Sequence, residues 1–281
     1  MTITLTPEFI RTLIPIRQPS SHKGSYGRVL IVAGSPRFPG APCLCARACM
    51  RSGSGLVTLA VEKEIFPIVA QKLDEAMVLD LQTYEMDFFQ LLHSADCVAF
   101  GCGSGIRDYS RKKLSLLLNR ISCPLVIDAD GLNLLAERPS LLHTDKTLIL
   151  TPHEGEFSRL TTTSIQDIKA NKVELAEAFA RNFGLILVLK GEISVITDGK
   201  TTYLSDVGVP EMATGGMGDA LTGVIASFIG QKISPLEASA LAVYLHSYTA
   251  RELSRSMYSV LAGDVISRLP FTIRELMSNR S

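Results

Sequence analysis

The sequence predicts an α/β fold in which a mainly parallel central sheet is covered by helices on both faces. Short runs rich in Val, Ile and Leu recur along the chain, and segments with helical spacing lie between them. These runs are apolar throughout instead of alternating, as in strands that are buried on both faces. Hydrophobic residues make up 46% of the 281 residues, and no low-complexity linker interrupts the chain. We therefore expect a single domain over residues 1–281.

Six buried strands are expected in the first two thirds of the chain. They are Arg28–Ala33, Leu56–Val61, Cys97–Phe100, Leu125–Ile127, Thr147–Leu150 and Leu185–Leu189. The helices expected between them are Pro42–Arg51, Glu64–Leu73, Ser110–Arg120, Leu132–Glu137, Glu154–Leu160 and Ile165–Asn182. This alternation is typical of right-handed βαβ crossovers over a parallel sheet.

The pattern changes after Lys190. The segments Ile193–Thr197 and Thr201–Leu204 flank Asp198-Gly199-Lys200, which predicts a hairpin. Beyond Gly215 the chain is expected to be nearly all helical, over Asp219–Gly230, Pro235–Arg255 and Gly263–Arg268.

The composition argues against several classes of partner. With 28 basic and 28 acidic residues the formal charge is zero, which does not favour binding to nucleic acid. No charge-free apolar run approaches the roughly 18 residues needed to cross a bilayer. The segment Met1–Gln18 lacks the basic-then-apolar order of a secretory signal, so we expect a cytoplasmic protein. The six cysteines form no CxxC pair and are interpreted as reduced thiols that pack as small apolar residues.

Two familiar phosphate-binding motifs are absent from the sequence. There is no G-x-x-x-x-G-K-[ST] segment, which excludes a P-loop. Gly101, Gly103 and Gly105 are followed by Ile106, where the dinucleotide fingerprint needs a glycine. The glycine-rich turns instead follow predicted strands, and ligands of open α/β sheets bind at the carboxyl ends of the strands.

The segment Thr214–Asp219 is the most informative candidate site. Three of its six residues are glycines, so its backbone N–H groups can turn toward one point at the start of a helix. A phosphate group fits such a helix N-terminus, and Asp219 beside it can take a proton from a substrate. In the alternative, Asp219 only caps the helix and the glycines only form a tight turn.

A second candidate lies at the predicted helix start after Thr147–Leu150. Thr151 and Glu154 have the spacing of a capping box, and Pro152 takes the first helical position. These three residues are explained without any function, but His153 is not. The helix dipole favours a neutral imidazole there, and His153 is either structural or a ligand-binding residue.

Two further polar residues follow predicted strands. Asp128 either contacts a cation or polar ligand or ends its strand in an Asx turn. Lys190, followed by Gly191, either binds phosphate or is simply solvated.

Taken in order, seven segments resemble the ADP-dependent NAD(P)H-hydrate dehydratases, a family of repair enzymes with a ribokinase-like fold. The matching segments are His22–Leu30, Gly40–Pro42, Arg51–Leu56, Val126–Asn133, Leu150–Glu156, Val188–Gly191 and Ala213–Asp219. Each segment is short, and the ordered set is what makes the resemblance specific.

The resemblance implies that the chain restores NADH or NADPH from the S-hydrate, with ADP as phosphoryl donor and release of AMP and phosphate. Asp219 is implied as the base that deprotonates the hydrate hydroxyl. The backbone amides implied to hold the phosphoryl group belong to Gly215, Gly216, Met217 and Gly218. The residues implied to line the adenosine nucleotide are Lys190, Gly191, Glu192, Ile193, Ser194 and Gly218. Those implied to contact the hydrate are Ala41, Gly103, His153 and Asp219.

Small-molecule kinases of the same superfamily, such as thiazole or hydroxymethylpyrimidine kinases, are the main alternative. They tend to have an Asn where this chain has His153, in an Asn-x-x-Glu pattern that places Mg²⁺ through waters. Glu156 keeps the carboxylate of that pattern and is the candidate for a water-mediated contact to Mg²⁺. A nucleotide-binding relative without activity is a third alternative, because Met217 stands where the family more often has threonine.

The resemblance also implies partners and substrates. The chain has no room for the epimerase domain that is often fused to these dehydratases, so we expect a separate NAD(P)H-hydrate epimerase as functional partner. We also expect a homo-oligomer. The hydrates of NADH and NADPH both stay open as substrates, and so do ADP and ATP as phosphoryl donors.

Overall fold

A computed structural model describes residues 1–278 and contains one ten-stranded sheet. The strand order is β1-β10-β9-β8-β7-β6-β5-β2-β3-β4. The bounds are β1 Thr2–Thr4, β2 Arg28–Val32, β3 Leu56–Val61, β4 Met77–Asp80, β5 Cys97–Phe100, β6 Leu125–Ile127, β7 Leu148–Leu150, β8 Ile186–Leu189, β9 Ser194–Thr197 and β10 Thr202–Ser205. Within the described chain only β9 runs against its neighbours, so the expected mainly parallel sheet is confirmed.

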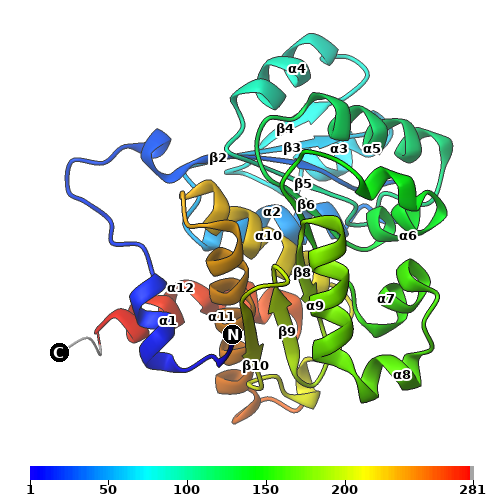
Figure 1. Ribbon diagram of the computed structural model, residues 1–281. Coiled ribbons are helices and arrows are strands. Elements are labelled where there is room, and N and C mark those ends of the chain that lie inside the picture. The colour runs from blue at the N-terminus through cyan, green and yellow to red at the C-terminus, as the bar shows by residue number, and fades with distance from the viewer. Residues whose placement is uncertain (279–281) are drawn as a thin grey trace.

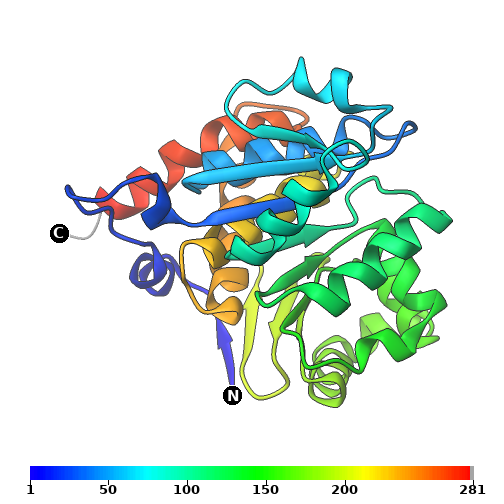
Figure 2. The ribbon, with the colours of Figure 1, turned by 90° about the horizontal axis from the view of Figure 1, so that it is seen from above.

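Helices cover both faces of this sheet, as Figure 1 and Figure 2 show. One face carries α1 Pro7–Leu13, α2 Ala41–Arg51, α3 Phe66–Ala70, α10 Met217–Gly230, α11 Pro235–Ser254 and α12 Ala262–Ser278. The other carries α4 Glu85–Ser94, α5 Asp108–Arg120, α6 Asp130–Glu137, α7 Glu154–Thr161, α8 Ile165–Ala170 and α9 Lys172–Phe183. None of the described helices is long and apolar enough to cross a membrane.

The uniformly apolar strands are explained by the two cores. In β2, Val29 and Ile31 belong to the core under α2 and α10, whereas Leu30 and Val32 belong to the core under α4 and α5. Successive side chains of a strand point to opposite faces, so a strand buried on both faces is apolar at every position.

Helix α10 is packed closely against α2, and this contact places the start of α10 at the carboxyl ends of the strands. A Cβ added at Gly223 would lie 2.1 Å from the carbonyl oxygen of Cys45, so α10 approaches the backbone of α2 directly. Cys43, Cys45 and Cys49 are buried in the same interface, where they serve as small core residues.

Several expectations about the elements were wrong. Strands β1 and β4 and helices α1 and α4 were not predicted. β1 and β4 are the edges of the sheet, and Met77 of β4 is exposed, so these strands lack the continuous apolar signal of the central ones. The expected helix Ile165–Asn182 is two helices that break at Asn171, which has φ −127° and ψ 37°.

The last helix also differs from the prediction. It was expected to end at Arg268, before Pro270, but α12 continues through Pro270 to Ser278. Leu269, Thr272 and Leu276 are buried on the core side of this helix, so tertiary packing outweighs the local effect of the proline.

Candidate active site

The candidate residues gather at the carboxyl ends of β5, β6, β7 and β8, next to the N-terminus of α10. A cavity of about 430 Å³ opens there, within the usual range for small-molecule sites. Of the residues predicted to bind the nucleotide, Lys190, Gly191, Glu192, Ser194 and Gly218 line this cavity. Ile193 does not line it; together with Gly191 and Glu192 it lines a second cavity. Met217 also lines the first cavity. Gly215 and Gly216 form the turn that precedes Met217 in the chain.

The N-terminus of α10 has no side-chain cap. Its N-cap residue is Gly216, which has φ +91°, a left-handed conformation that favours glycine. A Cβ there would also lie 2.5 Å from Cδ1 of Leu44. Within residues 1–278 no side chain accepts from the first turn, so the amides of Met217, Gly218 and Asp219 are left for a ligand. The alternative in which Asp219 caps the helix is therefore wrong.

Asp219 is a half-buried carboxylate on the first turn of α10. Burial raises the pKa of Asp219 from 3.8 to about 6, and the negative charge of Asp128 adds to that effect. The neighbouring Cys102 thiol and the positive charge of Lys190 act in the opposite direction. A carboxylate of this kind is ionised at neutral pH and is a stronger base than an exposed aspartate.

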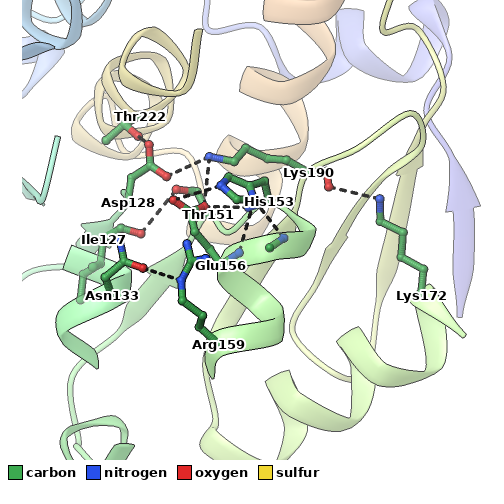
Figure 3. A network of polar contacts seen from close by, with 11 residues as sticks. Ile127, Asp128, Asn133, Thr151, His153, Glu156, Arg159, Lys172, Lys190 and Thr222 are labelled. Atoms are coloured by element: carbon green, nitrogen blue, oxygen red, sulfur yellow. Dashed lines mark hydrogen bonds and ion pairs between the residues drawn. The ribbon is translucent and has the colours of Figure 1, made fainter. Parts of the chain in front are cut away.

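A buried ion pair lies behind the first turn of α10 (Figure 3). Nζ of Lys190 donates to Oδ1 of Asp128 at 2.9 Å, and Oγ1 of Thr222 donates to Oδ2 of Asp128 at 2.9 Å. The side chain of Asp128 is 2% exposed and that of Lys190 is 20% exposed. The structure thus pairs Asp128 with the side chain of Lys190, and a contact of Asp128 with a bound ligand stays a prediction.

The charges of this pair stabilise each other. Burial disfavours the ammonium, but Asp128 and Glu156 together hold the pKa of Lys190 above its ordinary value. Burial also disfavours the carboxylate of Asp128, but Lys190 holds its pKa below the ordinary value. The pair is therefore ionised at neutral pH.

The capping box at α7 is formed by different residues from those predicted. Nδ1 of His153 accepts from the backbone N–H of Gly155 at 3.0 Å and of Glu156 at 3.3 Å. In return, Oε2 of Glu156 accepts from the backbone N–H of His153 at 2.9 Å. The predicted box of Thr151 and Glu154 is wrong because the segment from 151 to 153 continues the sheet. The backbone N–H of Lys190 donates to the carbonyl of Pro152 there at 2.8 Å.

His153 is a neutral residue at the surface of the site. Burial lowers the pKa of His153, and the positive charges of Lys190 and Arg159 add to this effect. Since Nδ1 accepts hydrogen bonds, the imidazole proton is on Nε2. The side chain is 56% exposed, which leaves it accessible to a ligand. Neutral imidazole suits binding through a hydrogen bond better than it suits ionic contact.

Ala41 and Gly103 lie side by side at the carboxyl ends of β2 and β5. Gly103 has φ +64°, and a Cβ at this position would lie 2.9 Å from Cβ of Ala41 and 2.8 Å from Cβ of Phe38. Only glycine fits here, so Gly103 lets the loop after β5 approach Phe38 and Ala41 closely. Phe38, which is 43% exposed, was not predicted as part of the site.

His246 is a further residue of the cavity that the sequence did not indicate. It lies within α11, is 3% exposed, and its Nε2 has no hydrogen-bond partner within the described residues. Burial lowers the pKa of His246 to about 4, so the imidazole is neutral. No local signal marks it, because it stands within a long apolar helix. Thr222 was also missed, although it stands three residues after Asp219 on the same helix.

The described residues contain no group of three His, Cys, Asp or Glu side chains that could hold a metal ion by themselves. Glu156 accepts a hydrogen bond from His153, and its Oε2 lies 4.0 Å from Nζ of Lys190. Burial raises the pKa of Glu156, whereas the positive charge of Lys190 acts in the opposite direction.

Comparisons with known proteins agree with this geometry. A sequence model of the NAD(P)H-hydrate dehydratase family matches residues 29–270. An ADP-dependent (S)-NAD(P)H-hydrate dehydratase of Listeria monocytogenes is 34% identical, over 95% of this chain and 94% of the relative. A bifunctional NAD(P)H-hydrate repair enzyme of Moorella thermoacetica is 38% identical over 97% of this chain, which spans 54% of that relative.

A solved structure gives the same result. The ADP/ATP-dependent NAD(P)H-hydrate dehydratase of Bacillus subtilis, crystallised with ATP and Mg²⁺, aligns with a TM-score of 0.89 and 30% identity. The alignment covers 98% of each chain.

Proposed function

This chain belongs to the NAD(P)H-hydrate dehydratase family, with its ribokinase-like fold, and from that premise we propose that it repairs hydrated nicotinamide nucleotides. The substrate is the S-hydrate of NADH or NADPH, and ADP is the phosphoryl donor. The products are NADH or NADPH, AMP and phosphate. The enzyme is a hydro-lyase that uses a phosphoryl transfer to turn a hydroxyl into a leaving group.

In the first step Asp219 takes the proton from the hydroxyl of the hydrate. The hydroxyl oxygen then forms a bond to the β-phosphorus of ADP, and the bond from that phosphorus to the AMP oxygen breaks. The bond between the ring carbon and the former hydroxyl oxygen then breaks, and phosphate leaves with that oxygen. The adjacent ring carbon loses a proton to solvent, which restores the ring double bond. The pKa of Asp219, raised by burial to about 6, supports this assignment, because the carboxylate is both ionised and basic near pH 7.

The glycine turn stabilises the phosphoryl group during its transfer. We assign this role to the amides of residues 215–218, since the first turn of α10 has no side-chain cap. We assign the adenosine nucleotide to the cavity and the loop beside it, formed by residues 190–194 with Gly218. We assign the hydrate to the surface formed by Ala41, Gly103 and His153; Nε2 of His153 lies 3.6 Å from Oε1 of Glu156 and carries the imidazole proton.

Mg²⁺ is expected to accompany ADP. It would reduce the negative charge of the nucleotide phosphates. The described residues supply at most a water-bridged contact from Glu156, which stays a prediction.

We further propose the cellular setting of the reaction. The chain acts as a single dehydratase domain in the cytoplasm, as a homo-oligomer, and a separate epimerase converts the other epimer of the hydrate. The bifunctional relative, of which this chain spans 54%, supports a link to such a second activity.

The observation that carries the proposal is the juxtaposition of Asp219 with an uncapped helix N-terminus beside a nucleotide-sized cavity. The test is to incubate the purified protein with hydrated NADH, ADP and Mg²⁺, and to follow reduced nicotinamide absorbance together with AMP and phosphate. Parallel reactions with ATP, and with hydrated NADPH, determine the preferred donor and substrate.

The same assay addresses the kinase alternative. Thiazole and hydroxymethylpyrimidine alcohols are offered with ATP, and phosphorylated product is measured. Phosphorylation of either alcohol, with no restoration of NADH, would overturn the proposed function.

A further inference from the structure

The Lys190 ammonium occupies a position that the family assignment does not explain. Lys190 lines the nucleotide cavity, but its ammonium is bound to the carboxylate of Asp128 (Figure 3). A Cβ added at Gly218 would lie 3.4 Å from Nζ of Lys190 and 3.2 Å from Oδ2 of Asp128. The ammonium and the Asp128 carboxylate thus both lie next to Gly218, in the first turn of α10.

The local charges show why a cation is needed here. The carboxylates of Asp219 and Asp128 both lie next to this turn, and a phosphoryl group adds further negative charge. In a partly buried site such charges repel strongly unless a cation is held among them. Lys190 is the cation whose charge acts on both Asp128 and Asp219.

We propose that Asp128 is a positioning residue for phosphoryl transfer: it fixes the Lys190 ammonium behind Gly218, where this ammonium balances the charge of the phosphoryl group that leaves ADP. This inference rests on the proposed function. It assigns Lys190 to the transferred phosphoryl group, beyond its predicted place in the adenosine nucleotide site.

The geometry of Asp128 supports a positioning role. One of its oxygens accepts from Lys190, after β8, and the other accepts from Thr222 in α10. Asp128 therefore fixes the distance between the ammonium and the helix whose first turn binds the phosphoryl group. An exposed lysine with a free side chain would lose conformational entropy each time it bound the phosphate.

The pair also acts on the base. The groups that influence Asp219 come from the surrounding elements: Asp128 after β6, Asp130 at the start of α6, Lys190 after β8 and the Cys102 thiol after β5. Removing the charge of Asp128 lowers the pKa of Asp219, whereas removing the charge of Lys190 raises it. The acid limb of the pH profile should therefore move in opposite directions in the two variants.

The test compares Asp128→Asn, Lys190→Met and the double variant with the wild-type enzyme. We expect Asp128→Asn to lower kcat by about tenfold or more, with little change in the KM for ADP, since the ammonium loses its fixed position. Lys190→Met should cost on the order of 10²–10³-fold in kcat, as other preorganised charge donors do. The acid limb moves to lower pH in the first variant and to higher pH in the second.

The double variant separates catalysis from folding. Breaking one partner of a buried ion pair destabilises a protein more than replacing both. We expect the double variant to recover thermal stability relative to Lys190→Met but to keep the loss in kcat. Asp80→Asn is the matched control, because Asp80 is a buried aspartate at the carboxyl end of another strand, β4, and accepts from Gln82 and Thr83. It should lose stability without any change in kcat or in the acid limb.

Binding gives a readout that does not depend on turnover. We expect Lys190→Met to reduce the preference for ADP over AMP by about tenfold, the contribution of one charge-assisted hydrogen bond. A double variant with wild-type kcat, or an unchanged preference for ADP over AMP in Lys190→Met, would overturn the inference. A wild-type enzyme that binds ADP but does not restore NADH would instead overturn the proposed function, and the binding comparison would still decide the role of Lys190.

Discussion

Replacement of Asp219 by Asn is the sharpest test of the proposed chemistry. The amide has nearly the same shape as the carboxylate but cannot accept a proton. Asp219 lies on the first turn of α10, whose backbone is held by the packing against α2, so the exchange leaves the turn and its amides in place. Only the base is removed, and the expected result is loss of turnover with nucleotide binding retained.

The magnitude follows from the environment of the carboxylate. General bases contribute roughly 10²–10⁴-fold to a rate. With a pKa of about 6 instead of 3.8, Asp219 is ionised to only about one tenth at pH 5, where an ordinary aspartate is ionised to about nine tenths. The wild-type kcat/KM for the hydrate should therefore fall about tenfold per pH unit below pH 6. The residual activity of the Asn variant should lack this acid limb.

Stability provides the control for misfolding. The pKa of Asp219 is higher in the folded than in the unfolded state, so the folded state binds the proton more tightly. This group stabilises the fold most below pH 3.8, and the contribution is lost as the pH rises toward 6. At pH 7 the buried charge is unfavourable, and Asp219→Asn should have a melting temperature at least as high as that of the wild type.

The assay is restoration of reduced nicotinamide absorbance at saturating ADP and hydrate, with ADP affinity measured by calorimetry. Affinity for ADP should hold or rise, because a negative charge beside the phosphates is removed. An Asn variant that kept more than about a tenth of the wild-type turnover would refute the reasoning, since that loss is below the range of a general base. An acid limb near pH 4 in the wild type would equally refute it.

Three further results are expected. His153→Ala should chiefly raise the KM for the hydrate and also lower the melting temperature, since it removes the cap of α7, worth about 0.5–2 kcal/mol; a loss confined to kcat would show that the role is misassigned. Gly103→Ala should raise the KM for the hydrate without affecting ADP binding, because its Cβ would lie 2.8 Å from Phe38 at a φ of +64°; equal KM values for the hydrate in variant and wild type would place the substrate elsewhere. Chelation of Mg²⁺ should abolish turnover while leaving the melting temperature of the nucleotide-free enzyme unchanged, because no ready-made metal cluster lies within residues 1–278; a large loss of thermal stability would instead indicate a structural metal.

The sequence alone determined much of the central architecture. The strands β2, β3, β5, β6, β7 and β8 are buried on both faces, so nearly all of their residues are apolar. Such continuous apolar runs can be recognised from the sequence alone. The glycine turn before α10 could also be recognised from the sequence. A helix N-terminus with three nearby glycines and no capping side chain is a local feature. The edge strands β1 and β4 could not be recognised from the sequence, because each pairs with another strand on one side only and lacks a continuous apolar run.

The tertiary structure alone decided the electrostatics of the site. Asp128 and Lys190 are 62 residues apart, and nothing in the spacing indicates that they form an ion pair. They meet because β6, β7 and β8 are neighbours in the sheet and their carboxyl ends share one edge. The capping role of His153 depends likewise on the bridge between that residue and Lys190. The raised pKa of Asp219 comes from burial and from charges on other elements. Both are properties of the folded chain, because in the unfolded chain water surrounds the carboxylate and distance weakens its interaction with those charges.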